Sequence, residues 1–392
     1  MTDPATRPAR NQYLTGNFAP VEAEATLTAL RVEGSLPSHL DGRYLRNGPN
    51  PVPVPSGPYH WFLGAGMVHG LRLRDGRAEW YRNRWVRSGD VADALGEPHH
   101  PGPVHAGMDF SANTNVIGHA GRTFAIVEGG GRPYELTDTL DTVGPCDFDG
   151  TLEGGYTAHP HRDPRTGNLL AVSYFWGWGD RVQFTELSPD GRITRAVDLD
   201  VPGGPMMHDF SFTDDHVVLY DQPVTFDLDV VMASAAGDPT ASPFPYRWNP
   251  DHPCRLGVFD RGGDGSDLTW FEVDPCYVYH PMNAYDDGDR IVLDVVRHAS
   301  TMRTDPSGPF ESNPRLDRWI LDRTGGKVVQ TTTDDHPQEF PRIDERLAGR
   351  DPDAQLEPSL ESEVADRKGG ANGTLRVVLV CGRRAEERHR RI

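Results

Sequence analysis

The sequence predicts an all-β fold, and within that class a β-propeller. Turn-forming residues are spread through the whole chain, with 42 glycines and 34 prolines among 392 residues. Apolar residues fall into short strand-like runs, and no stretch has the period of an amphipathic helix of three turns. Many hairpins with almost no helix are typical of barrels, sandwiches and propellers. Three widely spaced histidines then favour the propeller.

The strand-like runs alternate with pairs of turn residues. Examples of the runs are residues 168–175 (NLLAVSYF), 216–220 (HVVLY), 290–297 (RIVLDVVR) and 315–322 (RLDRWILD). The turn pairs are Asp75-Gly76, Asp190-Gly191, Gly262-Gly263, Asp287-Gly288 and Gly325-Gly326. Asp-Gly and Gly-Gly favour the tight turns that join antiparallel strands. The sequence therefore predicts a series of hairpins.

Three histidines stand in distinctive settings. These are His159 in Thr-Ala-His-Pro-His, His208 in Met-Met-His-Asp-Phe and His280 in Tyr-His-Pro-Met-Asn. Their separations of 49 and 72 residues are too wide for a zinc finger or a helical HExxH motif. In a propeller, inner strands from several blades converge on one channel, and blade repeats run to about 40–50 residues. Because imidazole is a frequent ligand of iron, copper, nickel and zinc, the three histidines predict a transition-metal site.

Charge and composition exclude several other classes. The formal net charge is −19, which argues against nucleic-acid binding because a phosphate backbone would repel such a surface. The four cysteines lack CxxC spacing, which favours a reducing compartment. The first residues form no apolar signal segment, and no run of about 18 apolar residues occurs. We therefore expect a cytoplasmic protein and leave peripheral membrane contact open.

Further segments resemble a known family. They are residues 44–51 (YLRNGPNP), 60–70 (HWFLGAGMVHG), 113–117 (NTNVI), 127–136 (VEGGGRPYEL) and 339–344 (EFPRID). Together with the three histidine motifs, and in the same order, they resemble the carotenoid cleavage oxygenases. These are non-haem iron dioxygenases that split conjugated alkenes. The resemblance extends from about residue 11 to about residue 350.

The resemblance implies a seven-bladed β-propeller with Fe(2+) on its axis, held by four histidines. His159, His208 and His280 match the first three iron ligands, and Glu128 and Glu339 match the carboxylates that hydrogen-bond to such ligands. The outer nitrogen of a metal-bound imidazole is usually held by a carboxylate, which fits these residue types. Beyond the iron centre the resemblance supplies no catalytic residue.

The activity implied by the resemblance is oxidative cleavage of one C=C bond of a carotenoid or apocarotenoid by O2, giving two carbonyl products. Such an apolar polyene needs a tunnel lined by aromatic and aliphatic side chains. Val127, Met206 and Tyr279 neighbour the ligand motifs, and we expect them to line it. The sequence leaves open which carotenoid and which double bond are involved, and also the oligomeric state.

The end of the chain departs from the family pattern. We divide the chain into an incomplete propeller at residues 1–350 and a divergent tail at residues 351–392. No residue matches the fourth iron histidine, since His389 lies among charged residues at the extreme end and His336 has no iron role in the family. We therefore expect an incomplete last blade or blades, from truncation or a frame-shift, and impaired or absent activity of this chain.

Two alternatives stay open. The first is cleavage of a stilbene by the same chemistry, although family members of that type carry a lysine where this chain has Val127. The second is a non-catalytic propeller that binds an apolar ligand or a protein partner. The missing fourth histidine favours this second alternative, whereas Glu128 and Glu339 argue against it.

Overall fold

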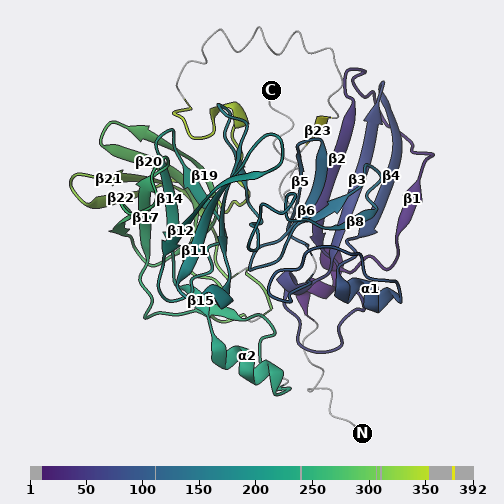
Figure 1. Cartoon of the computed structure of the whole chain (residues 1–392), viewed down its shortest axis with the longest axis horizontal. Helices are drawn as coiled ribbons and strands as arrows, with labels where there is room; N and C mark the ends of the chain where they lie inside the picture. Colours follow the sequence, from purple (N-terminus) through teal and green to yellow (C-terminus); the bar gives the residue numbers. More distant parts are fainter. Residues whose placement is uncertain are drawn as a thin grey trace.

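Antiparallel sheets of four strands make up most of the protein (Figure 1). The computed structural model describes residues 11–352, except 111, 239, 240, 306 and 310, and also the strand at residues 373–375. Of the predicted tail at residues 351–392, all other positions, Cys381 and His389 among them, lie outside the described residues. Within the described part, the sheets form five blades, which we number in chain order.

The first two blades form one side of the molecule in Figure 1. The first has the order β1-β4-β3-β2-β23, from β1 (Ala25–Leu27), β2 (Gly42–Pro49), β3 (Gly66–Arg74), β4 (Arg77–Trp85) and β23 (Gly373–Leu375). The second has the order β5-β6-β7-β8, from β5 (Asn115–His119), β6 (Arg122–Ile126), β7 (Tyr134–Leu136) and β8 (Thr142–Pro145).

The other three blades lie on the opposite side. The third contains β9 (His161–Arg162), β10 (Leu169–Tyr174), β11 (Arg181–Leu187) and β12 (Ile193–Asp200). The fourth contains β13 (Phe210–Phe212), β14 (His216–Asp221), β17 (Arg255–Asp260) and β18 (Thr269–Glu272), with the separate pair β15 (Val224–Phe226) and β16 (Tyr246–Trp248) inserted. The fifth contains β19 (Tyr277–Asp287), β20 (Arg290–His298), β21 (Arg315–Asp322) and β22 (Lys327–Asp334).

Helices are few and short. The described residues include two α-helices, α1 (Gly89–Leu95) and α2 (Leu228–Ala235). The 3₁₀ turns are η2 (Gln12–Leu14), η3 (Gly16–Phe18), η4 (Trp61–Leu63), η5 (Trp176–Trp178) and η6 (Glu345–Leu347). No helix within this part of the chain is long and apolar enough to cross a membrane. The predicted all-β propeller is confirmed.

The predicted hairpins are also confirmed. The four strand-like runs became β10, β14, β20 and β21, and each turn pair lies where two successive strands meet, with Asp287 as the last residue of β19. Asp75 and Gly76, for instance, have φ of 48° and 71° between β3 and β4. A two-residue turn with both φ values positive matches the twist of the strands it joins. Local turn chemistry therefore fixed the strand boundaries.

The apolar core lies between neighbouring blades. Leu45 and Val68 of the first blade pack in one cluster with Val116 of the second, and Phe124 of the second packs with Leu169 of the third. Similar clusters join the third blade to the fourth and the fourth to the fifth. Sheets with two apolar faces must stack on one another, and this stacking brings their edge strands together.

Polar side chains connect the inner strands of neighbouring blades. Asn47 Nδ2 on β2 donates to the carbonyl oxygens of Ala112 and Asn115, at 2.8 and 2.9 Å. Asn115 Nδ2 in turn donates to the carbonyl oxygen of Ala158, beside His159, at 3.1 Å. His161 Nε2 lies 2.6 Å from Asp209 Oδ1, beside His208. These contacts set the spacing of the blades at their inner edges.

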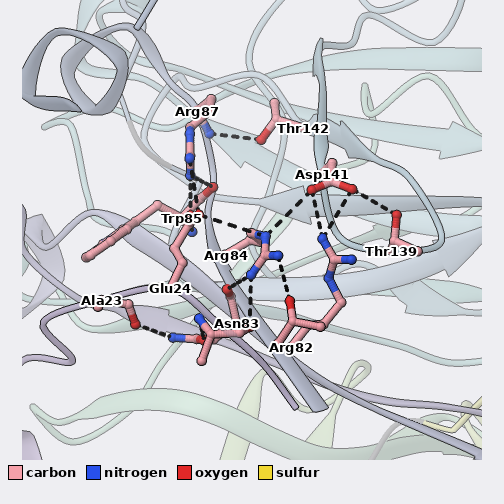
Figure 2. A network of polar contacts seen from close by, with 12 residues as sticks. Ala23, Glu24, Arg82, Asn83, Arg84, Trp85, Arg87, Thr139, Asp141 and Thr142 are labelled. Atoms are coloured by element: carbon pink, nitrogen blue, oxygen red, sulfur yellow. Dashed lines mark hydrogen bonds and ion pairs between the residues drawn. The ribbon is translucent and has the colours of Figure 1, made fainter. Parts of the chain in front are cut away.

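An arginine network fixes the outer part of the first blade (Figure 2). Arg82 and Arg84 on β4 both contact Asp141 Oδ1, at 3.1 and 3.6 Å. Arg87 pairs with Glu24, before β1, and its backbone N–H donates to Thr142 Oγ1 at 3.0 Å. Because Asp141 directly precedes the last strand of the second blade and Thr142 begins it, the network joins the N-terminal segment and two blades.

Candidate metal centre

The three predicted histidines meet at the inner edges of three successive blades. His159 lies just before β9, His208 just before β13, and His280 within β19. One ring nitrogen from each falls within a group whose members are all within 4.8 Å of one another. The Nε2 atoms of His208 and His280 are 3.4 Å apart, and the three ring centroids are separated by 4.5 to 5.2 Å. Residues far apart in sequence therefore present a compact set of nitrogen donors.

Two carboxylates contact two of the rings at Nδ1, the ring nitrogen other than Nε2. Glu128 Oε1 lies 2.7 Å from His208 Nδ1, and Glu339 Oε2 lies 2.7 Å from His280 Nδ1. A carboxylate oxygen accepts the hydrogen bond, so each Nδ1 is the donor and each Nε2 is the nitrogen left to face a metal. These two Nε2 atoms are the ones that face each other. The carboxylates thus hold both rings in the orientation that a metal-binding Nε2 requires.

Loop packing positions the third ring. A Cβ on Gly155 would lie 2.5 Å from the backbone carbon of Gly130, so the loop before His159 runs directly against the loop after Glu128. The backbone N–H of Tyr156 donates to the carbonyl oxygen of Gly131 at 2.9 Å. The backbone N–H of His159 donates to Thr157 Oγ1 at 3.2 Å. The absence of a side chain at Gly155 allows this approach.

His298 is a member of the site that the sequence motifs did not reveal. It is 1% exposed, and its Nε2 lies 2.6 Å from Glu339 Oε1, on the opposite side of the carboxylate from His280. Burial raises the pKa of Glu339, but the two histidines outweigh this effect and hold its pKa below the usual range. Strand pairing places His298 opposite Tyr277, three residues before His280. Only the register of β19 and β20 reveals this, so no motif could have identified His298.

Aromatic rings lie against two of the histidines. The ring of Tyr279 meets that of His208 edge-on at 5.2 Å, and the ring of Phe340 lies 4.6 Å from that of His280. Burial raises the pKa of Tyr279 well above its ordinary value, and its hydroxyl lies 2.8 Å from Thr301 Oγ1. Tyr279 therefore stays neutral and presents an apolar ring to the site.

The predicted lining residues lie in two apolar clusters. Met206 and Tyr279 belong to the cluster between the third and fourth blades, and the hydroxyl of Tyr277 donates to the carbonyl oxygen of Met206 at 2.7 Å. Val127 directly precedes Glu128 and packs in the cluster between the first and second blades. All three are buried. Contact of Val127, Met206 or Tyr279 with substrate stays a prediction.

The donor set fits a divalent transition metal. Neutral imidazole nitrogens suit iron, copper, nickel and zinc, and three of them leave coordination positions open for small molecules. One other group within the described residues could also hold an ion, formed by Asp334, Asp335 and His336, but His336 is exposed and the three residues are consecutive. The histidine centre is the one built from separate blades with supporting carboxylates.

Comparison with known proteins decides the family. A family model described as retinal pigment epithelial membrane protein matches residues 18–354. The chain is also 50% identical over 388 residues to a carotenoid cleavage oxygenase of Mycobacterium tuberculosis, across 89% of this chain and 77% of that protein. The chain belongs to the carotenoid cleavage oxygenase family. The resemblance inferred from the sequence motifs is thereby confirmed.

Other similar proteins are named for isoeugenol, lignostilbene and apocarotenoid. Isoeugenol monooxygenase of Pseudomonas nitroreducens is 31% identical over 363 residues, covering 86% of this chain and 73% of that enzyme. The crystal structure of Pseudomonas brassicacearum lignostilbene dioxygenase matches with a TM-score of 0.75 at 29% identity, covering 89% of this chain and 78% of that one. Cobalt-substituted Synechocystis apocarotenoid oxygenase shares the fold with a TM-score of 0.72 at 24% identity, over 85% of this chain and 74% of that one.

Proposed function

We propose that this chain is an iron(II)-dependent dioxygenase that cleaves one C=C bond of a carotenoid or apocarotenoid with O2 and releases two carbonyl products. The observation that carries the proposal is the group of His159, His208 and His280 nitrogens, backed by two carboxylates. Membership of an oxygenase family supports the same conclusion. We assign iron binding to the three histidines, and support of His208 and His280 to Glu128 and Glu339.

The protein's own contribution is to orient the histidine ligands and to surround them with apolar side chains. Bound ferrous iron would supply the activation of O2 towards an alkene. Glu128 and Glu339 hold two imidazoles in one orientation, which keeps their Nε2 atoms turned to the centre. Tyr279 and Phe340 place apolar ring surface against His208 and His280, which suits a hydrocarbon substrate.

Three histidine ligands set the expected strength of the site. Within the described residues the group holds three imidazoles, and three ligands bind a divalent ion less tightly than four of the same kind. With these three imidazoles alone, we expect weak iron affinity and low turnover. Excess ferrous iron should restore part of the activity, because mass action refills a weak site.

The test is dioxygen-dependent bleaching of an apocarotenal by the purified chain with added ferrous iron, with the products identified by mass spectrometry. We expect two carbonyl fragments whose oxygen atoms derive from ¹⁸O2. Bleaching without carbonyl products, or equal bleaching by His208→Ala, would refute the proposed reaction. A chain that binds iron but converts no polyene would favour the non-catalytic alternative.

A stilbene is the second candidate substrate, since lignostilbene dioxygenase is among the structural relatives. The surroundings of Val127 count against it, because an apolar cluster offers no cation to a phenolate. Replacing Val127 by lysine is not a clean discriminator, because the new ammonium would be buried in this cluster. Direct competition between an apocarotenal and a hydroxylated stilbene is sharper, and we expect faster turnover of the apocarotenal.

A further inference from the structure

Two buried thiols face each other between the fourth and fifth blades. Cys254 lies directly before β17, and Cys276 lies directly before β19. Their Sγ atoms are 4.0 Å apart, although the residues are 22 positions apart in the sequence. Cys254 is 7% exposed and Cys276 is fully buried. Neither residue takes part in the histidine centre.

Polar neighbours favour reaction at this pair. Gln222 Nε2 lies 3.7 Å from Cys276 Sγ, and Gln222 Oε1 accepts from the backbone N–H of Val278 at 2.9 Å, which fixes the amide. The hydrogen bond between the two sulfurs lowers the pKa of Cys254 and raises that of Cys276, and Cys254 Sγ also donates to the carbonyl oxygen of Cys276 at 3.7 Å. Arg297, which pairs with Val278 across β19 and β20, adds positive charge near both sulfurs. A thiolate stabilised in this way is a better nucleophile than an ordinary buried thiol.

We propose that Cys254 and Cys276 form an oxidisable dithiol that a hydroperoxide such as hydrogen peroxide closes to a disulfide. The Cys254 thiolate, the less buried of the two, attacks one peroxide oxygen, and the O–O bond breaks to give Cys254 sulfenic acid and hydroxide. Cys276 sulfur then attacks the sulfenic sulfur and expels its oxygen as water. In total, two thiols lose two hydrogens and one peroxide is reduced to two waters.

Closure requires only a local rearrangement. A disulfide needs its sulfurs about 2 Å apart, so rotation about the side-chain bonds must bring the Sγ atoms together by roughly the same distance. The new bond would tie the β17–β18 hairpin of the fourth blade to the start of β19. Because β19 carries His280 four residues later, the bond would also anchor the strand that holds this histidine. We expect the oxidised chain to unfold at a higher temperature than the reduced chain.

Peptide mapping of the full chain after peroxide treatment tests the proposal. The protein is reduced, freed of reductant, exposed to stoichiometric hydrogen peroxide and alkylated. We expect loss of two of the four thiols, a chain lighter by two hydrogens, and one cross-linked peptide containing Cys254 and Cys276. Dithiothreitol should reverse all three changes.

Single substitutions separate the two steps. In Cys276→Ser, Cys254 should stop at the sulfenic acid, which dimedone traps. In Cys146→Ser, a matched change at another buried cysteine, the cross-link should form as in the wild type. If Cys254 and Cys276 both remain open to alkylation after unfolding, while Cys146 or Cys381 is oxidised, the proposal is wrong. The wild-type peptide map distinguishes these outcomes even if a variant fails to fold.

Discussion

Glu339 contacts two histidines at once. One carboxylate oxygen holds the proposed ligand His280 at 2.7 Å, and the other holds the buried His298 at 2.6 Å. The carboxylate cannot rotate without breaking one of these bonds, so its direction, and that of the His280 ring, are fixed together. Glu128 makes the same type of contact to His208, but within the described part of the chain no second histidine holds its carboxylate.

Replacing Glu339 by glutamine should weaken metal binding. The amide keeps the size of the side chain but can present its single oxygen to only one of the two histidines. Loss of such a supporting carboxylate typically costs about 10–100-fold in metal affinity. Anaerobic titration with ferrous iron measures the change, and Glu33→Gln, at an exposed glutamate, is the control. Unchanged affinity in Glu339→Gln would mean that the carboxylate does not support the site.

Replacing His298 by phenylalanine should have a smaller effect in the same direction. An aromatic ring beside Tyr279 is kept, while the donor to Glu339 is lost. Because His298 acts on the metal only through Glu339, the double variant should bind iron no more weakly than Glu339→Gln alone. If the loss of iron affinity in the double variant equals the sum of the losses in the two single variants, His298 acts by a separate route.

At the level of the elements, the site depends on two loops that run against each other. Gly130 and Gly155 bring the loop after Glu128 and the loop before His159 into backbone contact. A proposed ligand and a supporting carboxylate are therefore positioned by one packing contact. Neither loop belongs to a long strand, so close approach replaces sheet hydrogen bonding here.

Adding a methyl group at this contact should lower both the stability of the fold and the affinity for iron. In Gly155→Ala the new Cβ would meet the Gly130 backbone at 2.5 Å, so the loops must separate. We expect a loss of about 1–3 kcal/mol in unfolding free energy, typical of overpacking, together with lower iron affinity. Urea unfolding and iron titration measure the two effects. Gly57→Ala, where a Cβ meets nothing within 4 Å, should change neither, and parity between the two variants would contradict the role of the contact.

Strands and turns could be predicted from the sequence where neighbouring residues determine the backbone conformation. Asp75-Gly76 and Asp287-Gly288 mark their hairpins because the turn residues themselves set the backbone angles. His159, His208 and His280 could be found from their motifs and from the expectation that blades converge. His298 could not, because its place depends on which residues of β19 and β20 face each other. The Gly130–Gly155 contact was hidden for the same reason, since it joins two blades.

For the whole molecule, buried histidines make the free energy of unfolding depend on pH. Burial lowers the pKa of His60 to about 3, against a smaller opposing effect of Asp305, whereas the unfolded chain has the ordinary value of 6.5. Between these two values the unfolded chain takes up a proton that the folded chain does not. Stability contributed by neutral His60 is therefore complete above pH 6.5 and falls as the pH drops towards 3.

This dependence should be visible in urea unfolding measured from about pH 7 to about pH 4. A single such group changes the unfolding free energy by at most about 1.4 kcal/mol per pH unit. His60→Asn can still accept from the backbone N–H of Phe62, as His60 Nδ1 does, but has no proton to gain, so its pH profile should be flatter. An identical slope in wild type and variant would show that other groups govern acid sensitivity.

The proposed oxygenase depends on three histidines from three blades holding one divalent metal ion. Anaerobic equilibrium binding of ferrous iron to the full chain tests this directly, with His208→Ala and His336→Ala compared in parallel. His336 belongs to the exposed Asp334–Asp335–His336 group and so controls for adventitious binding. We predict one iron per chain in the wild type and in His336→Ala, and loss of binding in His208→Ala. Binding that survives His208→Ala but disappears in His336→Ala would contradict the assignment of the histidine centre.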